Sequence, residues 1–408
     1  MKILKNLIND HLYGNTLWLI ADSIMLTGFG FLFWTINTRL FSSEQVGLAS
    51  TLLASVGLLV ALSLLGFDIA LIRYLPGFGK KNDMINSCFS LSGIIALLIS
   101  VIFVLKVDIF LPKLILLKNG VFGTLFIIFV VFNLFSALIP SVFIAIRKSK
   151  FVFIKDLIFS ILKLVFPFFF VFLGAYGIFS SWMISVIIAF IISLFFWRYK
   201  PRFRIHKKIV KKMLKFSVVN YISNFLGVAP GMILPLMITN VINPTTTAYF
   251  YIAWMIAMML FIVPVSISKS LLSEGSRIRK ENLKKKIKKS IKFVFVLLVP
   301  AMIAVVLLSK YFLLLFGQEY SENAYRLLQI LALSSIPFAI NKIYITINNI
   351  QHKINVVLLI NLIVAVGSLS LSYMLLSYGL IMVGFSWLVT QILVASFSTI
   401  KLIKIKND

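Results

Sequence analysis

The stretch YGIFSSWMISVIIAFIISLFFW, residues 176–197, is 22 residues long and contains no charged side chain. A helix of about 20 apolar residues is long enough to cross the hydrocarbon core of a bilayer. The next residues, RYKPRFRIHKK at 198–208, are rich in Lys and Arg. An apolar segment that ends in a basic cluster is typical of a transmembrane helix and its adjoining loop.

The whole chain has a composition that fits such helices. Of its 408 residues, 61% are hydrophobic and 13% are charged, and the mean hydropathy is +1.04. Soluble proteins contain about 45–50% apolar and about 25% charged residues, so we exclude a soluble enzyme. The single cysteine, Cys88, excludes an intramolecular disulfide, and three scattered histidines have no metal-ligand spacing. We predict no metal site and no cofactor.

Twelve stretches are long and apolar enough to span a membrane. They lie at residues 16–38, 46–67, 87–105, 123–145, 151–173, 176–197, 218–240, 247–268, 293–309, 324–346, 355–376 and 380–400. We therefore predict an all-α polytopic membrane protein with about twelve transmembrane helices.

The basic residues are divided unevenly between the two sides of this topology. If the termini and every second loop share one side, that side carries 31 of the 40 Lys and Arg, and the opposite side carries six. The positive-inside rule then puts both termini in the cytoplasm and the protein in the cytoplasmic membrane. The net charge of +28 thus reflects orientation and contact with anionic lipids, and we predict no nucleic-acid partner.

The basic loop near 198–215 divides the chain into two predicted six-helix lobes, residues 1–200 and 201–408. TRLFSSEQVG at 38–47 and TNVINPTTTA at 239–248 form similar short turns, 201 residues apart. Because six is even, both lobes enter from the same side, which predicts a parallel repeat about a central cavity with alternating access.

Charged residues inside spans are candidates for function, because a charge at mid-membrane costs at least ~2.5–3.5 kcal/mol. In FVFIKDLIFSILK, residues 151–163, Asp156 and Lys163 are seven apart and share a helix face. They serve either the cavity or only the packing of neighbouring helices. Lys155, nearer the edge, is expected to extend outward to the headgroups.

Further candidates are less deeply placed. Asp22 lines the cavity or is an interfacial carboxylate, and Asp68 is a weaker candidate for ion coupling. Arg39 and Lys342 join Lys163 as cations that could bind an anionic substrate. A candidate hinge in the seventh span consists of Gly227, Pro230, Gly231 and Pro235, and a static kink is the alternative.

Three stretches resemble the polysaccharide flippases of the multidrug/oligosaccharidyl-lipid/polysaccharide exporter superfamily. They are TINTRLFSSEQVGLA at 35–49, LLGFDIALIRYLP at 64–76 and LFGQEYSENAYRLLQILAL at 315–333. The resemblance implies twelve helices in two lobes around a cation-lined cavity. It also implies ion-driven flipping of an oligosaccharide on a polyprenyl diphosphate, using H⁺ or Na⁺, alongside other polysaccharide assembly proteins. Twelve spans argue against the fourteen-helix flippases of peptidoglycan precursors.

The chemistry of the residues agrees with this resemblance. A diphosphate needs buried cations, which Lys163, Arg39 or Lys342 would supply. The carboxylates of Asp22, Asp156 and Asp68 would bind the coupling ion. A multidrug exporter of the same superfamily is the main alternative, and a membrane glycosyltransferase or glycan polymerase is the second. The outer segments near 106–122 and 310–323 are short for such an enzyme, and no phosphate-cradling loop for ATP is present.

Overall fold

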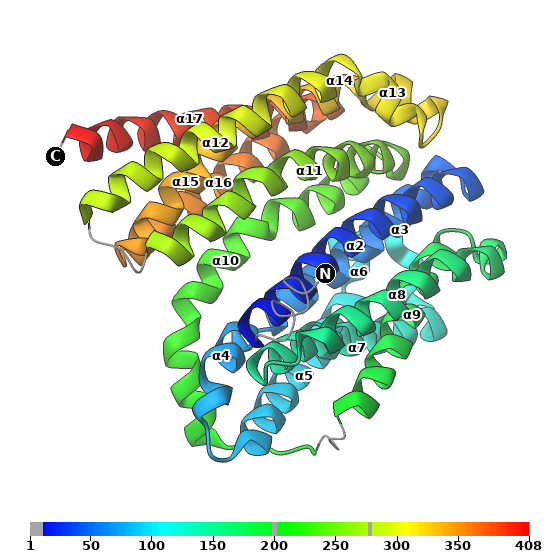
Figure 1. Ribbon diagram of the computed structural model, residues 1–408. Coiled ribbons are helices and arrows are strands. Elements are labelled where there is room, and N and C mark those ends of the chain that lie inside the picture. The colour runs from blue at the N-terminus through cyan, green and yellow to red at the C-terminus, as the bar shows by residue number, and fades with distance from the viewer. Residues whose placement is uncertain (1–10, 198–201, 276–279, 408) are drawn as a thin grey trace, which may run out of the picture. The chain divides into compact units, whose positions relative to one another are not determined.

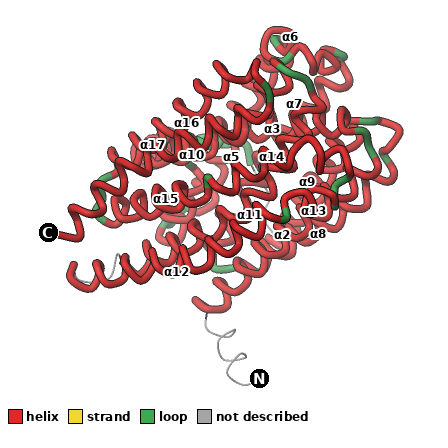
Figure 2. The backbone as a smooth tube through the Cα atoms, turned by 90° about the horizontal axis from the view of Figure 1, so that it is seen from above, coloured by secondary structure: helices red, strands yellow, loops and turns green. Residues whose placement is uncertain are grey.

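The computed structural model describes residues 11–197, 202–275 and 280–407. These residues are almost entirely helical, and Figure 2 shows no strand among them. The long helices are α2 (His11–Leu40), α3 (Ser43–Ser63), α5 (Lys81–Leu105), α7 (Gly120–Ala145), α8 (Ser149–Phe169), α9 (Ala175–Trp197), α10 (Lys207–Val241), α11 (Pro244–Gly275), α12 (Lys280–Leu307), α14 (Gln318–Leu333), α15 (Ser335–Ile350), α16 (Ile354–Leu375) and α17 (Leu380–Asn407). Shorter segments join them: α4 (Phe67–Tyr74), η1 (Leu75–Gly77), α6 (Val107–Phe110), η2 (Pro112–Lys118), η3 (Val171–Leu173), α13 (Ser309–Leu314) and η4 (Leu376–Tyr378).

Eleven helices of the described chain are long and apolar enough to cross a membrane, counting α14 and α15 as one span. The twelfth predicted span, α8, is a helix of 21 residues that contains Lys155, Asp156 and Lys163 and is therefore too highly charged to meet the same criterion. It packs against α2 and α9. The prediction of an all-helical polytopic membrane protein is confirmed.

The chain forms two compact units, one up to Tyr221 and one from Ile222 onward (Figure 1). The first unit extends past the predicted division at residue 200, because the start of α10 is bonded to the end of α3. The Ser217 hydroxyl donates to the Leu65 carbonyl at 3.2 Å, and the Tyr221 hydroxyl donates to the Ala61 carbonyl at 2.9 Å. The start of α10 therefore belongs to the first unit, together with the basic segment that leads into it.

The predicted short turns are present and have the same local structure. Helix α2 ends at Leu40 and α3 begins at Ser43, while α10 ends at Val241 and α11 begins at Pro244, each 201 positions later. In the first turn the Ser42 hydroxyl accepts from the backbone N–H three residues on, at 3.3 Å. In the second turn the Asn243 side chain does the same at 2.8 Å. Both residues satisfy an N–H group at the start of the next helix.

Two further turns recur 205 positions apart. Helices α7 and α8 are joined through Arg147 (φ 59°), and α15 and α16 are joined through His352 (φ 56°), both in the left-handed region. In each turn the next backbone N–H closes a 2.8 Å bond to the carbonyl five residues earlier. Helix α8 is followed by η3 and Gly174 (φ 56°), and α16 by η4 and Gly379 (φ 110°). These matching turns support a duplicated unit. The offset rises from 201 to 205, so the second unit has four more residues than the first between the short turn and the left-handed turn.

Candidate functional site

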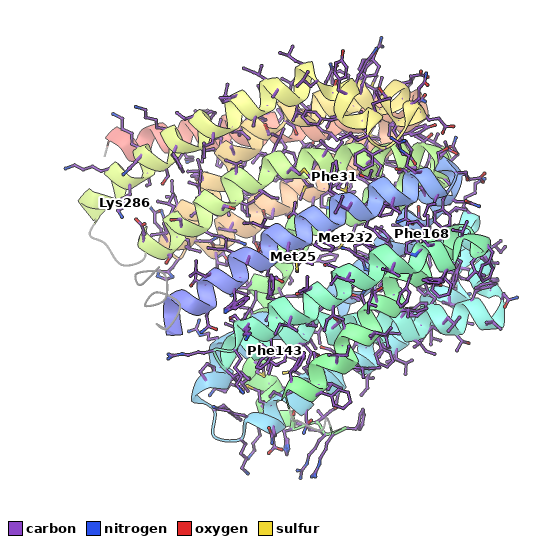
Figure 3. All side chains as sticks on the ribbon, turned by 45° about the vertical axis from the view of Figure 1, so that its right-hand side comes forward. Met25, Phe31, Phe143, Phe168, Met232 and Lys286 are labelled. Carbon is purple, nitrogen blue, oxygen red and sulfur yellow. The ribbon has the colours of Figure 1, made fainter. Side chains whose placement is uncertain are left out.

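The charged residues of α8 lie on its buried face. The buried residues of this helix include Val152, Lys155, Asp156, Phe159 and Lys163, which follow the three- and four-residue spacing of one helix side. In a bilayer the opposite, apolar side of such a helix can face lipid. Figure 3 shows α8 running beside α2, on which Met25 and Phe31 are labelled. The sequence thus turns its charges inward, toward α2, α7 and α9.

Lys155 and Asp156 form a buried ion pair at the centre of this face. Lys155 Nζ lies 2.8 Å from Asp156 Oδ1, and the two residues are only 5% and 8% exposed. Lys155 Nζ also donates to the carbonyl and the hydroxyl oxygen of Ser136 on α7, both at 3.4 Å. The expectation that Lys155 extends outward to the headgroups is therefore wrong. A buried carboxylate and a hydroxyl hold it inside the unit, where an unpaired charge would be costly.

Asp22 of α2 completes an acidic cluster with this pair. The residue is 8% exposed, and its carboxyl interacts electrostatically with Asp156 and Lys155. Its Oδ1 atom is buried and has no hydrogen-bond partner among the described residues. We refer to Asp22, Lys155 and Asp156 as the acidic cluster. With both carboxylates ionised it carries one net negative charge.

Lys163 lies two helical turns from Asp156 in an aromatic cage. Its Nζ is 4.6 Å from the ring centre of Phe159, 4.9 Å from that of Trp182 and 5.9 Å from that of Phe33. The residue is 1% exposed, and no hydrogen bond or ion pair to its Nζ is found within the described chain. Ring faces attract a cation by about 0.5–2 kcal/mol each. The cage therefore encloses the Lys163 amine, on which Asp156 acts electrostatically.

The other predicted site residues are not part of this cluster. Arg39 is exposed in the last turn of α2, and Asp68 is half-buried in the first turn of α4. Lys342 is half-buried on α15 in the second unit, where Lys269 of α11 acts on it electrostatically. Sequence reasoning therefore identified the two acids of the cluster and Lys163, but it assigned Lys155 to the wrong environment.

The predicted hinge lies within one continuous helix, α10. A Cβ atom at Gly227 would lie 3.8 Å from the Asn361 side chain, and one at Gly231 would lie 3.4 Å from Trp254 Nε1. Pro230 and Pro235 are also inside α10 and are buried. These distances leave room for a methyl group, so the glycines are not required by packing alone, and the hinge remains a prediction.

The second unit contains an uncharged counterpart of the acidic cluster. By the spacings of the matching turns, Asp22 corresponds to Ser223, 201 positions on, and Asp156 corresponds to Asn361, 205 positions on. These two also meet, because Asn361 Nδ2 donates to the carbonyl and hydroxyl oxygens of Ser223, both at 3.0 Å. Lys155 corresponds to Ile360. The same two helix positions thus carry ionisable groups in one unit and neutral groups in the other.

A buried polar network in the second unit was missed by the sequence reasoning. Asn341 Nδ2 donates to Gln391 at 2.8 Å, and the Ser398 hydroxyl donates to Asn341 Oδ1 at 3.2 Å. It joins α15 to α17 with neutral groups only, so no charge in the sequence marks it. The offset of 205 residues could have identified Asn341, because it makes Asn341 equivalent to Ser136, whose hydroxyl accepts a hydrogen bond from Lys155.

The described residues contain no group of three His, Cys, Asp or Glu that could hold a metal ion. The acidic cluster has two carboxylates and one lysine, which suits a proton or a monovalent cation better than a tightly held divalent metal.

Comparison with protein families shows to which family the chain belongs. Residues 36–325 match the model of a family described as a polysaccharide biosynthesis protein. The chain belongs to this family. The resemblance inferred from the sequence is thereby confirmed, and a search of curated proteins found no match.

Three solved structures with a similar fold are transporters. A multidrug resistance MATE transporter of the MOP superfamily, inward-facing, is 16% identical, with a TM-score of 0.66 and 96% of each chain covered. The lipid II flippase MurJ, inward closed, is 15% identical, with a TM-score of 0.75 over 96% of this chain and 89% of that one. A MOP superfamily transporter from Pyrococcus furiosus is 14% identical, with a TM-score of 0.59 over 97% and 94%. At these identities the likeness shows the fold alone. None of the three structures is a glycosyltransferase or a polymerase, so the comparison does not support those alternatives.

Proposed function

We propose that this multi-pass membrane protein flips a polyprenyl-diphosphate-linked oligosaccharide across the cytoplasmic membrane by ion-coupled alternating access. The family is one of polysaccharide biosynthesis, and the fold is that of MOP superfamily transporters. The observation that carries the proposal is the buried acidic cluster of the first unit, set against the neutral Ser223–Asn361 pair at the equivalent place in the second. The Ser223–Asn361 contact shows that neutral groups are enough to join the two helices. We infer that the charged groups of the acidic cluster have a further function.

That function is the binding of the coupling ion. With Asp22 and Asp156 ionised and Lys155 protonated, these three groups carry one net negative charge in a water-poor setting, which is unfavourable. Lys163 acts electrostatically on Asp156, but the two form no ion pair among the described residues. Binding one H⁺ or one Na⁺ removes the net charge of the cluster, and the unpartnered Oδ1 of Asp22 is the open acceptor. Ion binding would then change the stability of the α2–α8 contact and bias the switch between states. Asp68 lies apart from this cluster and is the weaker candidate.

Lys163 is the first candidate to bind the diphosphate. Its ammonium group is buried among three aromatic rings without an anionic hydrogen-bond partner in the described chain. A dianionic diphosphate would gain a strong charge-assisted bond on reaching it. Arg39 and Lys342 are the further candidates, and bending of α10 at its glycines and prolines would re-aim the helix during the cycle. The positive-inside rule supports cytoplasmic termini.

The decisive experiment replaces the three residues of the acidic cluster by the residue types found at the equivalent positions of the second unit. The triple variant Asp22→Ser, Lys155→Ile and Asp156→Asn carries the residue types found at the equivalent positions Ser223, Ile360 and Asn361. In proteoliposomes loaded with a labelled lipid-linked oligosaccharide, the wild-type protein should flip it faster under an imposed pH or Na⁺ gradient.

The neutral triple variant should fold but lose this gradient dependence. If it responds to the gradient as the wild type does, the cluster is not the coupling site. If cells gain resistance to cationic drugs while glycan export is unaffected by loss of the protein, the multidrug exporter is the correct function instead.

A further inference from the structure

An extended segment of the first unit lies along one face of α5. The backbone N–H groups of alternate residues donate to α5 side chains: Arg202 to Asn86 Oδ1 at 2.9 Å, Arg204 to Ser90 Oγ at 3.1 Å and His206 to Ser87 Oγ at 3.0 Å. The acceptors follow helical spacing on one side of α5. This bonding fixes the segment against α5.

A groove of about 230 Å³ lies beside this segment. Its walls come from Phe89 of α5, Phe132 and Phe135 of α7, and Phe190 and Leu194 of α9. Ring contacts hold the walls: the centres of Phe89 and Phe135 are 5.7 Å apart, and those of Phe132 and Phe190 are 5.9 Å apart. The groove is therefore preformed and almost wholly apolar.

One cation and one exposed aromatic ring line the groove. They are Arg202 and Phe203, and Phe203 is 78% exposed. Aromatic and basic side chains together are characteristic of the membrane–water interface. Arg204 and His206 are near Asp83, at 3.8 and 3.3 Å, whereas the Arg202 guanidinium has no ion-pair partner among the described residues. Arg202 is thus the cation available to an external anion.

We propose that this groove binds one acyl chain of an anionic phospholipid, with the lipid phosphate on Arg202. The apolar walls suit a hydrocarbon chain, and the Arg202 guanidinium suits a single phosphodiester. The volume is below the roughly 300–1,000 Å³ of sites that enclose a drug-sized ligand, so the groove holds a segment of one acyl chain rather than a complete polyprenyl tail. The site is independent of the acidic cluster and of the proposed flipping activity.

The test is a lipid titration of the purified full-length protein in detergent, read by native mass spectrometry. Phosphatidylglycerol should bind more tightly than phosphatidylcholine with the same chains. Arg202→Ala should weaken phosphatidylglycerol binding about fivefold, which corresponds to about 1 kcal/mol per cation at an anionic surface. Lys208→Ala, an equal loss of charge at a residue outside the groove, should leave the first binding step unchanged.

The acyl-chain part of the proposal has its own measurements. Leu194→Trp fills the groove and should reduce binding of both lipids. Glycerophosphoglycerol, which has the same phosphodiester but no acyl chains, should bind weakly to the wild type, which tests the groove even if the tryptophan variant fails to fold. Unchanged phosphatidylglycerol affinity in Arg202→Ala would overturn the proposal. Tighter binding of a polyprenyl phosphate at the same site would also overturn it.

Discussion

Replacing Lys155 by Ile tests whether charge pairing holds the acidic cluster together. At 2.8 Å and an effective dielectric constant of about 20, the Lys155–Asp156 attraction is worth roughly 6 kcal/mol, and it offsets the desolvation of both ions. Removing one partner of a buried pair typically costs about 3–5 kcal/mol, since the other charge is left buried. Lys155→Ile leaves the two carboxylates without their ion-pair partner, with only the more distant Lys163 acting on Asp156, and should lie in this range.

The companion variants give the expected order of stability. Asp156→Asn should cost less than Lys155→Ile, because Asp22 still interacts with Lys155. The neutral triple variant, in which Asp22→Ser and Asp156→Asn are combined with Lys155→Ile, removes every charge of the cluster at once. Its free energy of unfolding should lie within about 1 kcal/mol of the wild-type value, because neutral replacement of a buried ion pair is often tolerated.

Equilibrium unfolding of the purified protein in mixed micelles measures these differences. Lys118→Met is the matched control, because it breaks the Lys118–Asp108 pair of the same unit, which is 2.9 Å long but exposed, and should leave stability unchanged. Wild-type stability in Lys155→Ile would refute the charge-pairing account. A triple variant as unstable as Lys155→Ile would refute it too, since packing rather than charge would then hold α2 to α8.

Three further predictions concern other parts of the chain. Lys163→Ala should abolish glycan export while the protein stays at normal level in the membrane, as measured by surface-glycan staining with an immunoblot of the membrane fraction; normal export would remove Lys163 from the mechanism. Gly231→Ala has room beside Trp254 and should stabilise α10 by up to about 1 kcal/mol; if the residue is a hinge, flipping in proteoliposomes should nevertheless slow several-fold. The Lys118 ammonium lowers the pKa of Asp108, so this contact is intact above the usual carboxyl range and is lost as the pH falls through the lowered value; the protection of α6 and η2 amides against hydrogen exchange, corrected for the pH dependence of the intrinsic exchange rate, should fall on acidification, and Lys118→Met should remove that pH dependence.

The helices could be predicted from the sequence because the bilayer imposes a simple rule. Every backbone group in hydrocarbon needs an internal partner, so a long apolar stretch must be helical. The short turns at 41–42 and 242–243 were also readable, because Ser42 and Asn243 are residue types that satisfy exposed N–H groups at helix starts. The second repeat offset was not readable, since it depends on the left-handed turns at Arg147 and His352.

The candidate site was only partly predictable. Spacing alone puts Asp156 and Lys163 on one face of α8, and their cost in lipid marks them as unusual. Spacing does not say what lies opposite that face. Lys155, one position away, was expected at the surface and instead pairs with Asp156 and reaches Ser136 of α7.

The sequence by itself therefore determined that the chain is a polytopic helical membrane protein with a few charges inside its spans. These properties depend on composition and spacing along single helices. Only the tertiary structure decided that Asp22, Lys155 and Asp156 form one cluster, that three aromatic rings enclose Lys163, and that Ser223 and Asn361 repeat the contact without charge. The physical reason is that a buried charge is stabilised by its partners, and those partners come from helices far apart in the sequence.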